Sequence, residues 1–328
     1  MKNSIGGSIV LRSSCIAIIL LSALPLAVHA QAGAQTEDLN SATKGLLLLD
    51  ILNLKLETIR SYIGKPTDEV ANIIIKNATA REVFYQAVNL YNKSDRLAQE
   101  IVRHSSSLDP GKLNSESREE AVITVINATM QRIDAVVEEL GIQPHPAPEK
   151  NYSKIHATNS DLYVAILNTN QDINQLLDNK YRPAEVYQQL TNAIHIALTL
   201  FERFPETPRD FSEPEFIPGK TPSDVFNLLI ECYMRIREIA MLSKIEVLEI
   251  HSVSKNGLYV PSEVYDIATL LVSELSYIHD TVPGLSKANN SYFPGRVYPS
   301  DVYQRGLLLK RLLSNLHDLI MKNPDWRR

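Results

Sequence analysis

Two histidine–aspartate pairs, His279-Asp280 and His317-Asp318, carry the side chains best suited to hold a metal ion. Each histidine stands 18 residues after the proline of a repeated phrase, so the two pairs occupy equivalent positions. If the helices that carry them are parallel neighbours, two imidazoles and two carboxylates meet, and this set suits a borderline divalent cation. The alternative is that the two pairs are ordinary surface residues that were duplicated together with the repeat. Adjacent residues on a helix do not share a face, and a cationic histidine near a helix C-terminus is favoured without a ligand.

A second candidate site is a group of aromatic and cationic residues near the C-terminus. The group consists of Tyr292, Phe293, Arg296, Tyr298, Tyr303 and Arg305. Tyrosine and arginine are enriched among the residues that anchor protein interfaces. We therefore expect this segment to bind a small ligand or a protein partner. The alternative, for a tyrosine at a repeated position, is that it packs one helix start against a neighbouring unit.

The sequence contains no pattern that is specific to a catalytic mechanism. It lacks a zinc-protease helix signature, a glycine-rich phosphate loop and a Gly-x-Ser-x-Gly elbow. If the protein is an enzyme, the candidates for general acid–base chemistry are Glu263, Asp301, His279 and His317. No cofactor is predicted. Binding is favoured over catalysis because acids at repeated positions suit helix N-termini rather than a cleft where reactive groups converge.

The elements that position these residues are organised by a five-residue phrase, Pro-(Ala/Ser)-(Asp/Glu)-Val-(Tyr/Phe). The phrase begins at Pro183, Pro222, Pro261 and Pro299, which are 39, 39 and 38 residues apart. Proline suits the first turn of a helix, and an acid two residues later complements the free N–H groups there. Apolar residues then recur every three or four positions, as in an amphipathic helix. Degenerate copies begin at Ala80 and Asn159, whereas the segment from Arg118 is too weak to count as a copy on its own.

Because one such helix cannot bury its own apolar stripe, we predict an all-α protein. It is expected to be a multi-helix bundle or array built from repeats of about 38–39 residues, each a proline-led amphipathic helix followed by a long loop. The long loops could return along a helix, so the sequence allows the repeat helices to be parallel or antiparallel.

Periodic apolar residues predict further helices outside the four phrases. These helices are expected at about 40–63, 79–102, 117–140 and 160–177. Only a few residues join the last of them to the helix at 183–204, so we expect those two to form an antiparallel hairpin. Two short aliphatic segments, 70–75 and 245–250, are candidates for a pair of strands.

The N-terminal residues 1–30 read as a secretory signal peptide. A basic start is followed by an apolar run from Cys15 to Val28, which is short for a membrane span. Small residues precede Gln31, where cleavage is expected. The alternative is an uncleaved anchor. The rest divides into an N-terminal helical region at 31–143, a Pro-rich linker at 144–157 and a helical repeat region at 158–328.

The mature chain is mildly acidic. The full sequence has a net charge of −5, and the predicted signal peptide contributes two positive charges and no negative ones, which leaves −7. This balance argues against nucleic acid as a partner. One cysteine, Cys232, remains after cleavage, so no disulfide forms within one mature chain.

We expect a periplasmic or secreted, non-catalytic binding or scaffold protein that does not span the membrane after cleavage. Its partner would be another protein or a small ligand, bound through helix faces and long loops. The alternative is an all-helical periplasmic enzyme or metal-binding protein that uses loop-end acids and histidines.

Overall fold

The computed structural model describes residues 39–67, 72–103, 117–143, 151–206, 212–254, 259–289, 291–292 and 294–327. The predicted signal peptide and residues 144–150 of the predicted linker lie outside these ranges. Within them the chain forms eight α-helices: α2 (Ser41–Ile63), α3 (Ala80–Ile101), α4 (Arg118–Glu139), α5 (Asn159–Leu176), α6 (Pro183–Leu200), α7 (Pro222–Leu242), α8 (Pro261–Asp280) and α9 (Pro299–Lys322). The other elements are β1 (Asn72–Lys76), β2 (Glu249–Ser254) and the 3₁₀ turns η2 (Tyr152–Lys154) and η3 (Phe201–Arg203). The all-α class is confirmed.

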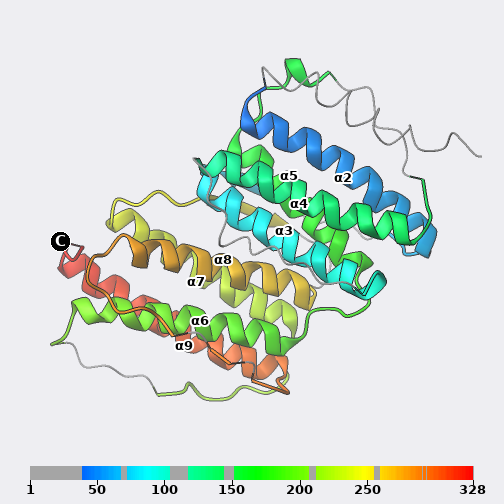
Figure 1. The fold of residues 1–328 in the computed structure, drawn as a ribbon. Helices are drawn as coiled ribbons and strands as arrows, with labels where there is room; N and C mark the ends of the chain where they lie inside the picture. The colour runs from blue at the N-terminus through cyan, green and yellow to red at the C-terminus, as the bar shows by residue number, and fades with distance from the viewer. Residues whose placement is uncertain are drawn as a thin grey trace, which may run out of the picture. The chain divides into compact units, whose positions relative to one another are not determined.

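The helices form two four-helix bundles that share one connectivity (Figure 1). The first bundle contains α2 to α5, and the second contains α6 to α9. In each bundle the first and second helices along the chain both pack against the third and the fourth. The four helices of each bundle therefore form a ring. The first and second helices along the chain lie at diagonal corners of this ring, and so do the third and fourth. None of the helices in the described ranges combines the length and the apolar character needed to cross a membrane.

All four helices of the second bundle run in the same direction. The first and fourth residues of each helix line one small apolar hollow, which brings together Pro183, Val186, Pro222, Val225, Pro261, Val264, Pro299 and Val302. The four valines are almost fully buried there. The proline-led phrases thus mark the end of the bundle where the helix N-termini meet, and the repeat helices are parallel.

The first bundle is parallel as well. At its N-terminal end the side chain of Asn40 donates to the carbonyl of Ala157, and at the other end Lys65 donates to the carbonyl of Leu176, so α2 and α5 begin and end together. Ion pairs at matching heights align α4 with α2 and α3; they join Lys55 to Asp134 and Arg132 to Asp95.

The acid of the phrase caps its own helix. In six helices the third residue accepts a hydrogen bond from the backbone N–H of the N-cap residue, at 2.5 to 2.9 Å. The six acids are Glu82, Asp161, Glu185, Asp224, Glu263 and Asp301. Each carboxylate occupies one free N–H group and places negative charge at the positive end of the helix dipole.

The serine of the phrase connects neighbouring helices. Its hydroxyl accepts the N–H of the residue two positions before the next helix around the ring. The three such bonds join Ser223 to Tyr259, Ser300 to Lys220 and Ser160 to Ala78, at 3.0 to 3.1 Å. A serine or alanine is small enough for this close approach of two helix starts.

The aromatic residue of the phrase packs onto the same residue, which stands two positions before the neighbouring helix. Phe226 stacks on Tyr259 with ring centroids 3.7 Å apart, and Tyr265 stacks on Tyr181 at 4.3 Å. In the equivalent place, the ammonium of Lys220 lies 4.4 Å from the centroid of the Tyr303 ring. These contacts follow one direction around the second bundle, from α9 to α7 to α8 to α6.

The predicted hairpin at 160–177 and 183–204 is wrong. Only residues 177–182 separate α5 from α6, but α5 packs against α2 and α3, whereas α6 packs against α8 and α9. The short link passes from the C-terminal end of the first bundle to the N-terminal end of the second. The predicted strand pair is confirmed with shifted bounds, because β1 and β2 pair antiparallel and connect the two bundles.

The capping role of the acid predicts a stability change. Replacing Asp224 with alanine should lower the free energy of unfolding by about 1 kcal/mol, since the Thr221 N–H loses its acceptor. Urea denaturation at pH 7 measures this loss. The matched control is Asp280→Ala at the C-terminal end of α8, where the carboxylate is exposed and faces the negative end of the dipole. An equal loss in both variants would contradict the capping role.

Candidate ligand site between the two bundles

The two bundles meet through polar side chains that are removed from solvent. Helices α3 and α8 lie against each other in opposite directions. Arg81 near the start of α3 pairs with Glu274 late in α8, whereas Lys93 farther along α3 pairs with Asp266 early in α8. Any site at this interface is therefore built from both bundles.

The polar side of α3 is a stripe with helical spacing. Its members are Glu82, Gln86, Asn89 and Lys93, with exposed fractions of 1, 6, 7 and 0%. Residues three and four apart share one helix face, so the four side chains point toward the same neighbours. In the sequence, such a stripe is the ordinary solvent side of an amphipathic helix. The sequence alone therefore does not point to this site.

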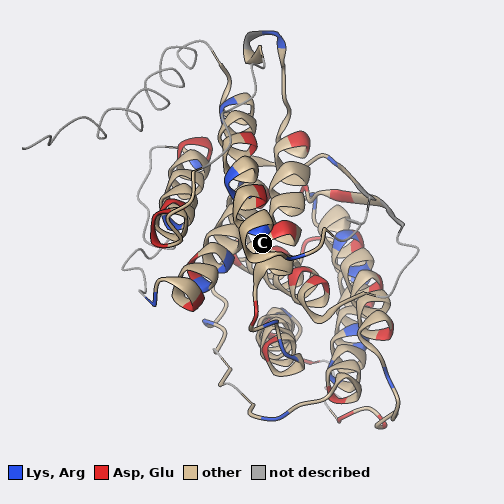
Figure 2. Ribbon diagram, turned by 90° about the vertical axis from the view of Figure 1, so that its right-hand side faces the viewer, with Lys and Arg blue, Asp and Glu red and all other residues tan. Residues whose placement is uncertain are grey.

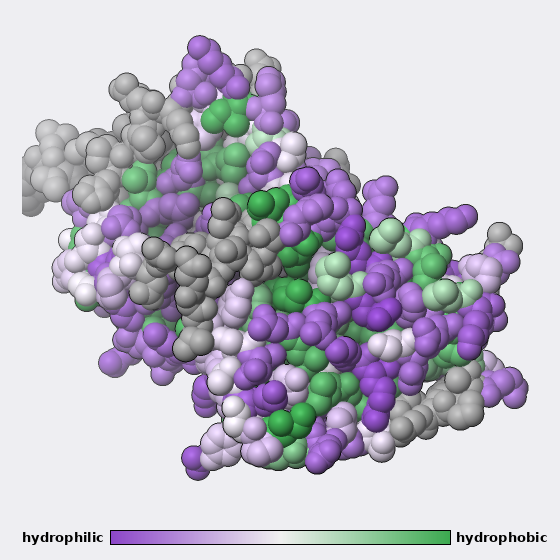
Figure 3. All heavy atoms as spheres, turned by 180° about the vertical axis from the view of Figure 1, so that it is seen from behind, coloured by the Kyte–Doolittle hydropathy of each residue, from purple (hydrophilic) through white to green (hydrophobic). Residues whose placement is uncertain are grey.

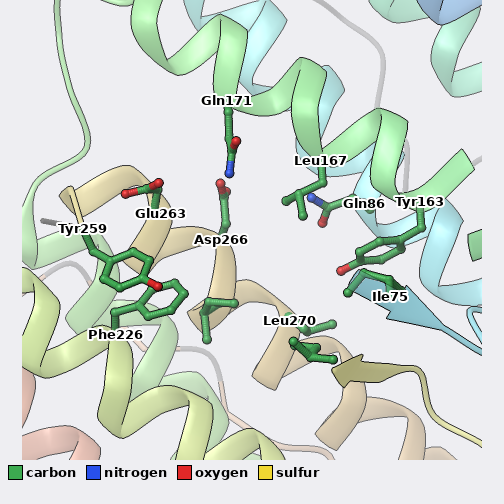
Figure 4. A pocket seen from close by; sticks show the side chains of 12 residues that line it. Ile75, Gln86, Tyr163, Leu167, Gln171, Phe226, Tyr259, Glu263, Asp266 and Leu270 are labelled. Carbon is green, nitrogen blue, oxygen red and sulfur yellow. The ribbon is translucent and has the colours of Figure 1, made fainter. Parts of the chain in front are cut away.

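A small pocket, here called the interbundle pocket, lies in this interface (Figure 4). It is lined by Ile75, Gln86, Tyr163, Leu167, Gln171, Phe226, Ile250, Tyr259, Glu263, Asp266, Ile267 and Leu270. Its free volume is about 30 Å³, which is room for about two water molecules. Figure 4 shows the ends of Gln171 and Asp266 facing each other and the hydroxyl of Tyr163 pointing inward.

Two amide groups at the pocket have unused hydrogen-bonding atoms. Nε2 of Gln86 and Oε1 of Gln171 are buried and make no hydrogen bond with any described residue. The two side chains are only 6 and 7% exposed. Leaving a buried donor or acceptor unpaired costs about 1–3 kcal/mol, so such groups call for an explanation. One atom is a donor and the other is an acceptor.

The carboxylates at the pocket are already engaged. Oδ1 of Asp266 accepts from Asn89 at 3.0 Å and lies 2.6 Å from Nζ of Lys93. Glu263 accepts the N–H of Val260 as the cap of α8. Burial lowers the pKa of Lys93, and the adjacent Asp266 carboxylate opposes that shift.

A cluster of three ionisable side chains joins the bundles beside the pocket. Arg81 lies 2.7 Å from Glu274 and 3.1 Å from Glu82, and its guanidinium sits 4.0 Å from the centroid of the Tyr277 ring. Glu82 also accepts the N–H of Leu248 from the second bundle. Burial raises the pKa of Glu274 to about 7, with Arg81 opposing this shift and Glu82 adding to it.

The predicted metal residues are not brought together. Helices α8 and α9 occupy diagonal corners of their bundle. Nε2 of His279 donates to the carbonyl of Ser286 at 2.9 Å, so that nitrogen carries a hydrogen and cannot bind a metal. Asp280 and Asp318 each lie 3.3 Å from the histidine that precedes them, His279 and His317. Across the described ranges, no group of three or more histidine, cysteine or acidic residues could hold a metal ion.

The predicted aromatic and cationic group is divided between separate places. Tyr292 and Arg305 line a common hollow between α6 and α9. The guanidinium of Arg296 lies 5.3 Å from the ring centroid of Tyr298, which is exposed. Phe293 lies outside the described residues.

Three other candidate residues serve the repeat. Glu263 and Asp301 accept the N–H groups that begin α8 and α9, and Tyr303 faces Lys220 as described above. In Figure 2 acidic and basic residues alternate along the helices in view, and in Figure 3 hydrophobic residues form separate patches among hydrophilic ones. The strongest candidate for a functional site is therefore the buried interface between the two bundles.

The Glu274 carboxyl predicts a pH effect. In the folded chain it keeps its proton up to about pH 7, whereas its ordinary pKa is 4.5. The folded state therefore binds more protons between these values, and this stabilising contribution is lost as the pH rises from 4.5 through 7. Replacing Glu274 with glutamine should flatten this part of the stability profile and raise stability at pH 8 by on the order of 1–3 kcal/mol.

Chemical denaturation from pH 4.5 to 8 measures the difference between wild type and variant. Asp280→Asn, at the exposed end of the same helix, is the control and should keep the wild-type slope. An unchanged slope in Glu274→Gln would contradict the role of this carboxyl.

Comparisons with protein-family models, with curated proteins and with solved structures found no match for this chain. A function is therefore inferred from the geometry of the chain itself.

Proposed function

We propose that the protein is an exported, non-catalytic binding protein that holds a small polar ligand between its two bundles. The observation that carries this proposal is the pair of unused amide atoms, Nε2 of Gln86 and Oε1 of Gln171, buried at the interbundle pocket. A ligand with one acceptor and one donor would pair both atoms at once. Without a partner, both atoms lower the stability of the folded chain.

The chemistry of the pocket favours binding over catalysis. The unused groups are neutral amides, which neither gain nor lose protons near neutral pH. The acids that could serve in catalysis are engaged, Asp266 with Lys93 and Asn89, and Glu263 with a helix N-terminus. General acid–base catalysis needs a titratable group within reach of the substrate and free to exchange a proton.

The pocket also limits the shape of the ligand. Phe226, Ile267 and Leu270 supply an apolar wall, and the two amides and Tyr163 supply the polar side. A small amide, amine or alcohol with a short apolar body fits this division. Because the free volume is about 30 Å³, a ligand larger than two waters requires the bundles to separate. Movement of two lobes around a ligand is a common form of domain closure.

Export is the second part of the proposal, and it is supported by the sequence of residues 1–30. The basic start, the apolar run and the small residues before Gln31 together favour passage through the secretory system to the periplasm or the exterior.

The test replaces the two amides separately, as Gln86→Leu and Gln171→Leu. Each variant should be more stable than wild type by about 1–2 kcal/mol without ligand, because an unpaired buried polar atom is removed. Thermal denaturation with millimolar acetamide, ethanolamine, glycerol or acetate should reveal a probe that stabilises wild type and neither variant. Gln99→Leu, an exposed position on the same helix, is the matched control and should respond as wild type does.

The opposite pattern would contradict the proposal. If both variants lose stability and no probe stabilises wild type, the amides hold structural water and the pocket has no ligand. A probe that stabilises the wild type and both variants equally would place binding elsewhere.

A further inference from the structure

A larger hollow lies on the outside of the second bundle, between α6 and α9. We call it the outer hollow; its walls include Tyr187, His195, Tyr292 and Arg305, and its volume is about 490 Å³. Small-molecule sites commonly measure about 300–1,000 Å³. The connection from α8 to α9 crosses α6 here (Figure 1) and supplies one wall. The outer hollow uses none of the residues of the interbundle pocket.

The wall formed by that connection is held in place by hydrogen bonds. The side chain of Asn192 accepts from both the N–H and the hydroxyl of Ser291, at 2.9 and 2.8 Å. Gln188 donates to the carbonyl of Ser291 at 3.1 Å. His195 donates through Nδ1 to the carbonyl of Asn289 at 2.7 Å. Because that carbonyl can only accept, the neutral imidazole presents Nε2 as an acceptor.

Arg305 on α9 is also fixed, and its charge is balanced. Its Nε donates to Thr191 at 3.2 Å, and its Nη1 donates to Glu213 at 2.6 Å. The guanidinium carbon lies 5.3 Å from the centroid of the Tyr187 ring. Nη2 has no hydrogen-bond partner among the described residues and remains available as a donor. Glu213 balances the charge of the guanidinium, and the remaining Nη2 donor can pair with a neutral acceptor such as a hydroxyl oxygen.

Tyr292 is the most exposed large side chain at the rim. Its exposed fraction is 95%, although tyrosine normally buries much of its ring. An exposed ring beside fixed, uncharged donors and acceptors offers an apolar platform together with directional hydrogen bonds.

We propose that the outer hollow is a binding site for a neutral saccharide. A sugar ring has an apolar C–H face that can rest on Tyr292, and its hydroxyl groups both donate and accept. One hydroxyl donates to Nε2 of His195, and another accepts from Nη2 of Arg305. A neutral polyhydroxylated ring matches the volume and the balanced charge better than an anion does. This site is independent of the ligand proposed between the bundles.

The test measures binding of glucose, galactose, N-acetylglucosamine and maltose to the full mature chain by saturation-transfer NMR and calorimetry. At least one sugar should bind wild type, and Tyr292→Ala should weaken binding tenfold or more. Tyr298→Ala is the matched control, because Tyr298 is also exposed but lies outside the outer hollow. It should bind as wild type does. Both tyrosines are exposed, so equal denaturation midpoints will show that the variants remain folded.

Gln86→Leu should leave sugar binding unchanged, which separates this site from the interbundle pocket. Three results would overturn the inference: no sugar binds, both tyrosine variants lose binding equally, or acetate and phosphate bind in place of the sugars.

Discussion

Four helix N-termini of the same polarity lie together at one end of the second bundle, and the rest of the structure has to accommodate them. Each N-terminus behaves as about half a positive charge, so parallel packing sets four of them against one another. The carboxylates of the phrase offset this repulsion, because each one accepts an N–H at the start of its own helix. These acids are Glu185, Asp224, Glu263 and Asp301. Serine and aromatic positions then link α9 to α7 and α7 to α8, and an aromatic pair links α8 to α6. One short phrase therefore provides the cap, the core contact and the link to a neighbour.

Parallel packing also explains the long connections. Within the bundles, consecutive helices are separated by 16 to 21 residues. Such a segment spans at least about 50 Å when extended, which exceeds the roughly 30 Å length of a 20-residue helix, so the chain can return to the starting end. The connection between α5 and α6 has only residues 177–182 because no return is needed there. The two bundles run in opposite directions, and the second begins where the first ends. Most of the loop length thus follows from topology.

The sequence predicted the helices well because their starts depend on local chemistry. A proline, an acid and an apolar stripe act within one or two turns, and α3 and α5 begin at Ala80 and Asn159, where the two degenerate copies begin. It did not predict which helices are neighbours, since ring order depends on contacts between distant segments. That is why His279 and His317 appeared able to meet although α8 and α9 are diagonal. The interbundle pocket was missed for a related reason: Gln86, Asn89 and Lys93 have the spacing of a solvent face, and only the second bundle buries them.

The proposed binding function is consistent with two regular bundles that bury the unpaired amide atoms of Gln86 and Gln171 where they meet.

The account depends on the parallel arrangement of the helices within each bundle, which pulsed electron paramagnetic resonance can test directly. Spin labels at Arg182→Cys and Tyr298→Cys, at the exposed starts of α6 and α9, should lie within about 20 Å of each other, because packed helix axes are about 10 Å apart. The native Cys232 is fully buried and should not be labelled. A distance of about 30 Å or more, the separation expected when neighbouring helices of this length run in opposite directions, would contradict the account.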